Sequence, residues 1–452
     1  MEEPIVIVSA DGHTGGPPEI YRDYIESKYL GALDALTAEN DEWVGITTSA
    51  GGTAKCHPSE VLDVIDERNA IRTDGELGAW DMARRLRELD AEGVAGELLL
   101  SGHQCSTLPF FGTVNHPYSP ELRAAGTRAY HRWLADCITA SHGRLFGVAE
   151  PGPCLDMDET VKELRWVADH GFVGVLAPGM VFDEALPSLQ DPYYEPFWTA
   201  CAETRLVVTM HAGWGGVQGQ FQKFLEFRKE HMGAEIDQDA VRKLLDTRDD
   251  SPIRLTLGPR RSLWQLMLGG VFDRHPQLRL MLTEVRADWL PATLAHLDRR
   301  FDELGSPMRR RPSEYFASNC GVAPSSPHRA EIEMRHEIGV ERFLFGVDYP
   351  HPEGTWPNTY DWIRDAFAGV PEHEARQILG ENAIAFYGLD SAALVAAAQR
   401  IGPKPSEVLG RHDVDPRKIE HFHKRSGYSR PAEEIDTDAI DRALEQDVAQ
   451  LV

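Results

Sequence analysis

The sequence predicts an eight-stranded parallel β/α barrel, and three observations lead to this fold class. Short apolar segments alternate with longer segments of helical periodicity, which is typical of parallel βα units. Eight apolar segments of this kind can be counted along the chain. Several of them end on a carboxylate or a histidine, as strands do when they present an active site at the carboxyl face of a barrel.

The expected strands are short and are separated by segments long enough to hold a helix. They are Ile5–Ser9, Glu97–Ser101, Leu145–Ala149, Gly174–Ala177, Leu206–His211, Leu278–Thr283, Tyr315–Asn319 and Phe343–Val347. Asp158–His170 predicts a helix, because it begins with acidic residues and is followed by a glycine. Leu122–Ser141 carries apolar residues at helical spacing, and Leu263–His275 stops directly before a proline.

The chain has 452 residues, more than a minimal barrel needs. Gly31–Leu89 and Trp214–Pro259 are long connections, and connections of this length are usually lids or binding loops over the active face. We therefore expect residues 1–389 to form a (β/α)8 TIM barrel with long insertions after strands one and five. Residues 390–452 should form a C-terminal extension that packs on the barrel or on a partner subunit. In this extension, Arg411–Arg430 predicts irregular structure and Glu433–Val452 a final amphipathic helix.

The composition excludes some classes of partner. Lys and Arg number 46 and Asp and Glu 72, so the formal net charge is −26, which argues against a nucleic-acid or anionic membrane surface. The 6 cysteines have no paired spacing, as in reduced cytoplasmic proteins. No apolar segment is long enough to span a membrane, and the N-terminus lacks a basic leader. We expect a cytoplasmic protein, and its size and C-terminal extension suggest a homodimer.

Polar side chains at the expected strand ends predict a metal site. Asp11 and His13 share one side of the first strand, because strand residues alternate faces. His211, Glu284 and Asp348 end or directly follow three other strands, and all should meet at the carboxyl face. Carboxylates and imidazoles crowded together repel or stay unsatisfied unless a cation binds them. Such mixed donors suit iron, manganese or zinc.

Further residues have two interpretations each. His103, at the end of the second strand, is a sixth ligand or proton donor, or a hydrogen-bonded loop histidine. His351 would ligate a second metal or orient Asp348. Glu150, at the end of the third strand, is a weaker candidate. His131 lies in a helical segment and is expected at the surface.

At these residues the chain resembles the amidohydrolase superfamily, in the branch that contains aminocarboxymuconate-semialdehyde decarboxylase and γ-resorcylate decarboxylase. The segments that carry the resemblance, within Ile5–Leu389, are Asp11-Gly-His13, Tyr130–Pro151, His211, His275–Pro291 and Phe345–Pro350. The resemblance implies one divalent metal held by Asp11, His13, His211 and Asp348. At the position of the family's catalytic strand-six histidine this chain has Glu284. This difference is a departure from the residues that ordinary decarboxylation or water-attack chemistry uses.

The departure at Glu284 makes the site richer in oxygen donors. With His103 and His351 nearby, the chain is similar in character to the TIM-barrel nonheme diiron monooxygenases of platensimycin- and platencin-type diterpenoid biosynthesis. That resemblance implies two Fe ions, O₂, an external electron donor and hydroxylation of a bulky acyl substrate, as a CoA thioester in secondary metabolism. The ligands would then be Asp11, His13, His103, His211, Glu284 and Asp348, and the catalytic residues Asp348, His103 and His351.

Two alternatives stay open. The first is a mononuclear hydrolase or nonoxidative decarboxylase, in which one Zn or Mn activates water or substrate and Asp348 is the general base. The second is a catalytically inactive barrel that binds a small molecule or a partner protein. The convergent set of ligand-type residues argues against the inactive barrel.

Overall fold

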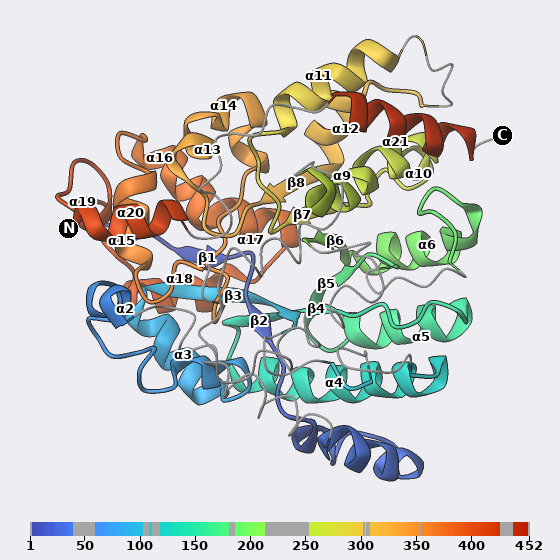
Figure 1. Ribbon diagram of the computed structural model, residues 1–452, viewed down its shortest axis with the longest axis horizontal. Coiled ribbons are helices and arrows are strands. Elements are labelled where there is room, and N and C mark those ends of the chain that lie inside the picture. Colours follow the sequence, from blue (N-terminus) through green and yellow to red (C-terminus); the bar gives the residue numbers. More distant parts are fainter. Residues whose placement is uncertain are drawn as a thin grey trace.

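The computed structural model describes residues 2–38, 59–102, 108–110, 118–179, 186–212, 253–301, 303, 308–351, 354–424 and 437–450. Parallel strands form its centre, and helices surround them (Figure 1). The strands are β1 Ile7–Ser9, β2 His13–Thr14, β3 Val94–Ser101, β4 Leu145–Ala149, β5 Phe172–Leu176, β6 Val207–His211, β7 Leu280–Thr283 and β8 Cys320–Ala323. They pair in the order β1-β3-β4-β5-β6-β7-β8, and β2 extends the first strand alongside β3.

Residues 343–349 occupy the eighth strand position and close the barrel. Leu344 N–H donates to the Val322 carbonyl in β8 at 2.9 Å, which joins this segment to one edge of the sheet. On the other edge, Ala10 N–H donates to the Phe345 carbonyl at 2.8 Å and Asp348 N–H to the Asp11 carbonyl at 2.9 Å. The predicted (β/α)8 TIM barrel is confirmed.

The seventh strand lies later than expected. The predicted strand Tyr315–Asn319 is wrong: it lies within helix α12, Pro312–Asn319, and β8 begins only at Cys320. Proline fits the first turn of a helix, and the Glu314 carboxylate accepts a hydrogen bond from the Arg311 backbone N–H at 2.8 Å, which caps the helix start. The true strand, Cys-Gly-Val-Ala, has a weaker apolar signal than the helix before it.

The helices mostly fill the positions that the sequence predicts. They are α2 Ser59–Ile65, α3 Met82–Ala91, α4 Pro120–Ala140, α5 Met157–Ala168, α6 Glu195–Thr204, α9 Ile253–Leu268, α10 Val271–Arg274, α11 Leu290–Phe301, α12, α13 Arg329–Glu333, α14 Arg335–Ile338, α15 Thr359–Ala366, α16 Glu372–Arg376, α17 Asn382–Tyr387, α18 Ser391–Ile401, α19 Pro405–Val408, α20 Pro416–Lys424 and α21 Thr437–Ala449. Two glycines, Gly269 and Gly270, divide the expected helix Leu263–His275 between α9 and α10.

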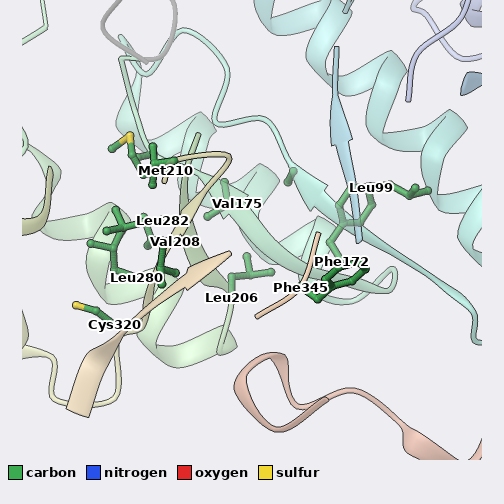
Figure 2. Close-up of a cluster of buried hydrophobic side chains, with 14 of the residues drawn as sticks. Leu99, Phe172, Val175, Leu206, Val208, Met210, Leu280, Leu282, Cys320 and Phe345 are labelled. Carbon is green, nitrogen blue, oxygen red and sulfur yellow. The ribbon is translucent and has the colours of Figure 1, made fainter. Parts of the chain in front are cut away.

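Two clusters of buried apolar side chains form the core. The larger one joins strands to the surrounding helices and includes Val208, Leu280 and Leu282, which lie together in Figure 2. The second contains side chains from the strands and from α17 and α18. A methyl group on Gly96 of β3 would lie 2.3 Å from Leu394 Cδ2 of α18, so this helix contacts the strand backbone closely. Residues beyond 389 therefore contribute to the same core.

The C-terminal helices dock on the barrel through ion pairs and hydrogen bonds. Helix α20 lies inside Arg411–Arg430, so the prediction that this segment is irregular is wrong. Its Lys418 Nζ lies 2.7 Å from Asp361 and 2.9 Å from Glu67. These two contacts attach α20 to the rest of the fold. Helix α21 lies beside α9 (Figure 1). Its fully buried Asp447 accepts hydrogen bonds from Arg261 and other side chains of α9. Residues 425–436 lie outside the described residues.

The first insertion is partly described and the second is not. Within Gly31–Leu89, residues 39–58 lie outside the described residues, and the rest contains α2, most of α3 and the short helix η4, Gly75–Ala79. Of Trp214–Pro259, residues 214–252 also lie outside the described residues. In the part of the chain that the structure describes, no helix is both long and apolar enough to cross a membrane.

Candidate metal centre

The strand ends bring six of the predicted site residues into two overlapping groups. In the first, one ligand atom from each of Asp11, His13, His211 and Glu284 lies within 4.8 Å of the others. In the second, His13 is joined by Asp348 and His351 under the same limit. His103 lies outside the described residues.

Asp11 Oδ1 lies between the two imidazoles of the first group. It is 3.6 Å from His13 Nε2 and 3.6 Å from His211 Nε2. Glu284 Oε2 lies 3.1 Å from His211 Nε2 on one side. Asp348 Oδ1 lies 3.3 Å from His13 Nε2 on the other side, and 3.0 Å from His351 Nδ1. The five ligand-type residues found at strand ends thus surround one small volume.

The backbone at two strand ends is held in an unfavourable conformation. Glu284 has φ 54° and Asp348 has φ 60°, in the left-handed region that residues other than glycine rarely adopt. Such conformations persist where the surrounding structure holds them, and they gather at functional sites. Here each one turns the chain sharply at the end of a strand and leaves a carboxylate beside a histidine.

Backbone carbonyls fix the orientation of both histidines in the first group. His13 Nδ1 lies 3.3 Å from the Ser101 carbonyl oxygen, and His211 Nδ1 lies 3.0 Å from that of Ala212. A carbonyl only accepts, so each Nδ1 carries a proton and donates, which leaves each Nε2 facing the cluster. Ser325 Oγ donates to Asp11 Oδ2, which leaves Oδ1 for the cluster.

Three buried atoms of the cluster fit a divalent cation. Asp11 Oδ1, His13 Nε2 and His211 Nε2 are buried and have no hydrogen-bond partner among the residues that the structure describes. Buried polar atoms are normally paired, because leaving them without a partner costs free energy. Two imidazole nitrogens and carboxylate oxygens are donors that manganese, zinc and iron accept. The donor set therefore fits one such ion.

The charges of the cluster shift its pKa values strongly. Burial lowers the pKa of His13 well below its usual value, and the neighbouring imidazoles of His351 and His211 lower it further. Burial also lowers the pKa of His211, but Glu284 and Asp11 outweigh it and raise that pKa to about 10. Burial, with Asp348 and Asp11 nearby, raises the pKa of Glu284 to about 8. The His211–Glu284 pair therefore holds at least one proton at neutral pH.

Metal affinity is expected to rise with pH as a result. A ligand must lose its proton to bind a cation, so protons compete with the ion below the pKa of the pair. We expect the association constant for Mn²⁺ to rise at least about tenfold per pH unit between pH 6 and 8, with at least one proton released. Isothermal calorimetry in buffers of different ionisation enthalpy measures this release. The control is Glu195→Gln, which removes one member of the remote His275–Glu195 pair, whose atoms lie 2.7 Å apart. A wild-type affinity for Mn²⁺ that does not change with pH would show the prediction wrong.

Exposure indicates the side from which a substrate reaches the cluster. The side chain of Glu284 is 23% exposed and that of His351 is 14% exposed, whereas Asp11 and Asp348 are fully buried. A ligand that enters the site therefore meets Glu284 and His351 first.

Some polar residues around the site differ from their sequence-based interpretation. His131, expected at the surface, is fully buried: its Nε2 accepts from the Glu150 N–H at 3.0 Å, and its Nδ1 lies 2.8 Å from Glu163. Glu150 itself accepts a hydrogen bond from Ser101 Oγ. Burial raises the pKa of Glu150 to about 7. Glu150 is thus hydrogen-bonded to Ser101, the residue whose carbonyl orients His13.

Glu331 supports the loop that follows Glu284, and the sequence carries no signal for it. It is fully buried, and its carboxylate accepts from the backbone N–H of Ala287 at 2.8 Å and of His328 at 3.0 Å. Burial raises the pKa of Glu331 to about 7, although these two hydrogen bonds lower it. The folded protein therefore binds this proton more tightly than the unfolded chain does.

Replacing Glu331 with glutamine is expected to reduce the pH dependence of stability. A raised folded-state pKa contributes stability that is present below the unfolded pKa near 4.5 and is lost as pH rises through about 7. The wild-type free energy of unfolding should lose about 3 kcal/mol at most over this window, and Glu331→Gln should lack this loss. Urea unfolding at pH 5 and 7 measures it, with the exposed Glu333→Gln as control. Equal pH dependence in wild type and Glu331→Gln would refute it.

Comparison with known proteins finds decarboxylases. The chain is 29% identical over 254 residues to a gamma-resorcylate decarboxylase of Rhodococcus jostii, which covers 53% of this chain and 69% of the relative. A gamma-resorcylate decarboxylase of a Rhizobium species is 28% identical over 258 residues, with the same coverage of 53% and 69%.

Solved structures share the fold. The 5-carboxyvanillate decarboxylase of Sphingomonas paucimobilis matches 85% of this chain and 100% of its own, with a TM-score of 0.57 and 20% identity. A dihydroxybenzoic acid decarboxylase of a Polaromonas species, solved with bound manganese, matches 87% of this chain and 99% of its own, with a TM-score of 0.55 and 18% identity.

These findings overturn the leading functional prediction. The prediction of a diiron monooxygenase that hydroxylates a CoA-linked acyl substrate is wrong, because the curated relatives are gamma-resorcylate decarboxylases. The expected O₂ and external electron donor, and the role in secondary metabolism as an oxidoreductase, fall with it. The two Fe ions expected for that reaction are not supported either.

Comparison with a family model shows which family the chain belongs to. The model described as amidohydrolase matches residues 113–389, which include β4 to β8 and the strand ends that carry His211, Glu284 and Asp348. This stretch is more than half of the chain, and the chain belongs to the amidohydrolase family.

Proposed function

We propose that the protein is a metal-dependent, nonoxidative decarboxylase of a small aromatic carboxylic acid. The observation that carries the proposal is the buried group of Asp11, His13, His211 and Glu284, whose ligand atoms lie within 4.8 Å of one another. The curated relatives are gamma-resorcylate decarboxylases, and they supply the substrate class. The Glu284 carboxylate, where the resemblance places a histidine, adds an oxygen donor to this group.

In this proposal the four residues of the first group hold one manganese or zinc ion. A bound divalent cation supplies Lewis-acid polarisation of substrate oxygens. His13 and His211 present Nε2 because the carbonyls of Ser101 and Ala212 fix their tautomers. Glu284, the most exposed member of the group, lies on the side from which the aromatic acid enters.

Asp348 and His351 handle the proton that the reaction requires. Loss of CO₂ from an aromatic acid leaves the bonding electron pair on the ring, and a proton must reach the same carbon. His351 is part-exposed and its Nδ1 lies 3.0 Å from Asp348 Oδ1, so the buried carboxylate is placed to balance the charge of the imidazole ring when it is protonated. His351 gives that proton to the ring carbon, the C–C bond breaks, CO₂ departs, and solvent reprotonates His351.

The test is product formation from candidate aromatic acids. Protein loaded with Mn²⁺ or Zn²⁺ is incubated with 2,6-dihydroxybenzoate or 5-carboxyvanillate, and the decarboxylated arene is followed by liquid chromatography. We expect one of these acids to lose its carboxyl group, and chelation of the metal to stop the reaction. No arene from either acid, with one metal ion bound per chain, would refute the proposed substrate class.

A further inference from the structure

The first insertion carries a buried charged pair that the proposed reaction does not use. Arg85 of α3 and Glu97 of β3 are both fully buried, and Arg85 Nε donates to Glu97 Oε2 at 2.7 Å. Burying two charges is costly unless their geometry is good and further hydrogen bonds satisfy them. The remaining contacts of Arg85 show what this pair is bound to.

The Arg85 guanidinium joins two of the chain segments that carry ligand-type residues, those of His13 and Asp348. Its Nη1 donates to the carbonyl of His13 at 2.7 Å and to that of Gly78 at 3.0 Å. Its Nη2 donates to the carbonyl of Tyr349, the residue after Asp348, at 3.2 Å. One rigid planar group therefore spans β2 and the end of the eighth strand position, and lysine has no such fork of donors.

The backbone between the first two ligands lies against the same pair. A methyl group on Gly12 would lie 2.2 Å from Glu97 Oε1, so only glycine at this position lets the segment approach the carboxylate. The helix η4 holds the opposite side: Ala79 carbonyl accepts from Gly15 N–H at 3.0 Å, and Gly75 carbonyl from Tyr349 Oη at 2.5 Å. Residues 75–97 thus contact the segments around His13 and Asp348 through Arg85, Glu97 and η4.

We propose that Arg85 is a positioning residue for the metal centre, and that it acts by fixing the separation of the segments that carry His13 and Asp348. The proposal rests on the metal centre of the proposed function, but not on its substrate. Outer contacts that orient ligands typically change metal affinity by about 10- to 100-fold when they are removed. Arg85 makes such contacts through the ligand backbone rather than through the ligand side chain.

The test is titration with Mn²⁺, followed by the electron paramagnetic resonance signal of the unbound ion. Arg85→Lys keeps the charge opposite Glu97 but loses the three-way bridge, and it should bind Mn²⁺ about 10- to 100-fold more weakly than wild type. The neighbouring Arg84→Lys is the matched control, because Arg84 pairs with Glu88 and donates no hydrogen bond to the ligand segments. Circular dichroism checks that each variant is folded.

The outcomes separate the two proposals. A dissociation constant of folded Arg85→Lys within twofold of wild type overturns the positioning role and leaves the proposed function standing. An equal loss of Mn²⁺ affinity in Arg84→Lys also overturns the positioning role of Arg85. If wild type binds neither Mn²⁺ nor Zn²⁺, both proposals fail. Should Arg85→Lys not fold, the double variant Arg85→Met with Glu97→Gln removes both charges, and unchanged Mn²⁺ affinity there refutes the role of Arg85.

Discussion

His211→Ala is expected to abolish metal binding and to lower the rate of decarboxylation at least about 1,000-fold, which corresponds to about 4 kcal/mol of transition-state stabilisation. His211 Nε2 is a buried atom without a hydrogen-bond partner among the described residues, and it lies 3.6 Å from Asp11 Oδ1. Removing it takes away a nitrogen donor and leaves carboxylates that repel one another. Elemental analysis after dialysis measures the metal, and a progress curve measures the rate.

His170→Ala is the matched control for His211→Ala. His170 is exposed in the turn between α5 and the amino end of β5, where its Nδ1 donates to the Trp166 carbonyl at 2.7 Å. This variant should keep the metal and the rate of wild type. Full metal content in His211→Ala would contradict the assigned ligand set.

Asp348→Asn should separate proton transfer from metal binding. Asparagine keeps the size of the side chain and an oxygen that can accept from His351, but it cannot balance the charge of a protonated imidazole. Because general acid catalysis contributes about 10²- to 10⁴-fold, we expect kcat to fall within that range. Metal content should stay at the wild-type value, because the first group does not include Asp348. Single-turnover kinetics and elemental analysis measure the two quantities.

Asp390→Asn supplies the control for the loss of a carboxylate. Asp390 caps α18 at the surface, where asparagine caps almost as well, so rate and metal content should both be unchanged. If Asp348→Asn lost metal in proportion to its rate, Asp348 would be a ligand of the ion and not part of the proton-handling pair.

The strand ends of the site could be predicted because their signal is local. An apolar run that stops at a carboxylate or histidine, as at His211 or Asp348, is visible in a few consecutive residues. The parallel barrel then follows from the alternation of such runs with helices. The strand Cys320–Ala323 was misplaced because four small or moderately apolar residues compete with a well-capped helix directly before them.

The supporting residues of the site could not be predicted, because their contacts are long-range. Arg85 reaches the Tyr349 carbonyl across 264 positions of sequence, and Glu331 reaches the Ala287 N–H across 44. In the sequence both are ordinary charged residues of helical segments. Only the folded barrel shows that they are fully buried.

The reaction could not be chosen from the ligand types alone. The same histidines and carboxylates accept iron, manganese or zinc, so the donor set fits oxygen chemistry and decarboxylation equally well. The single carboxylate at Glu284 does not by itself distinguish the two reactions. Similarity to curated decarboxylases extends over 254 residues, and it points to the nonoxidative reaction.

Release of ¹³CO₂ from a carboxyl-labelled 2,6-dihydroxybenzoate, measured by mass spectrometry under argon and under air, tests the central claim most directly. Protein that holds one manganese or zinc ion per chain should release CO₂ at the same rate in both atmospheres, with one arene formed per CO₂. Product that forms only under air, with oxygen incorporated into it, would contradict a nonoxidative decarboxylase.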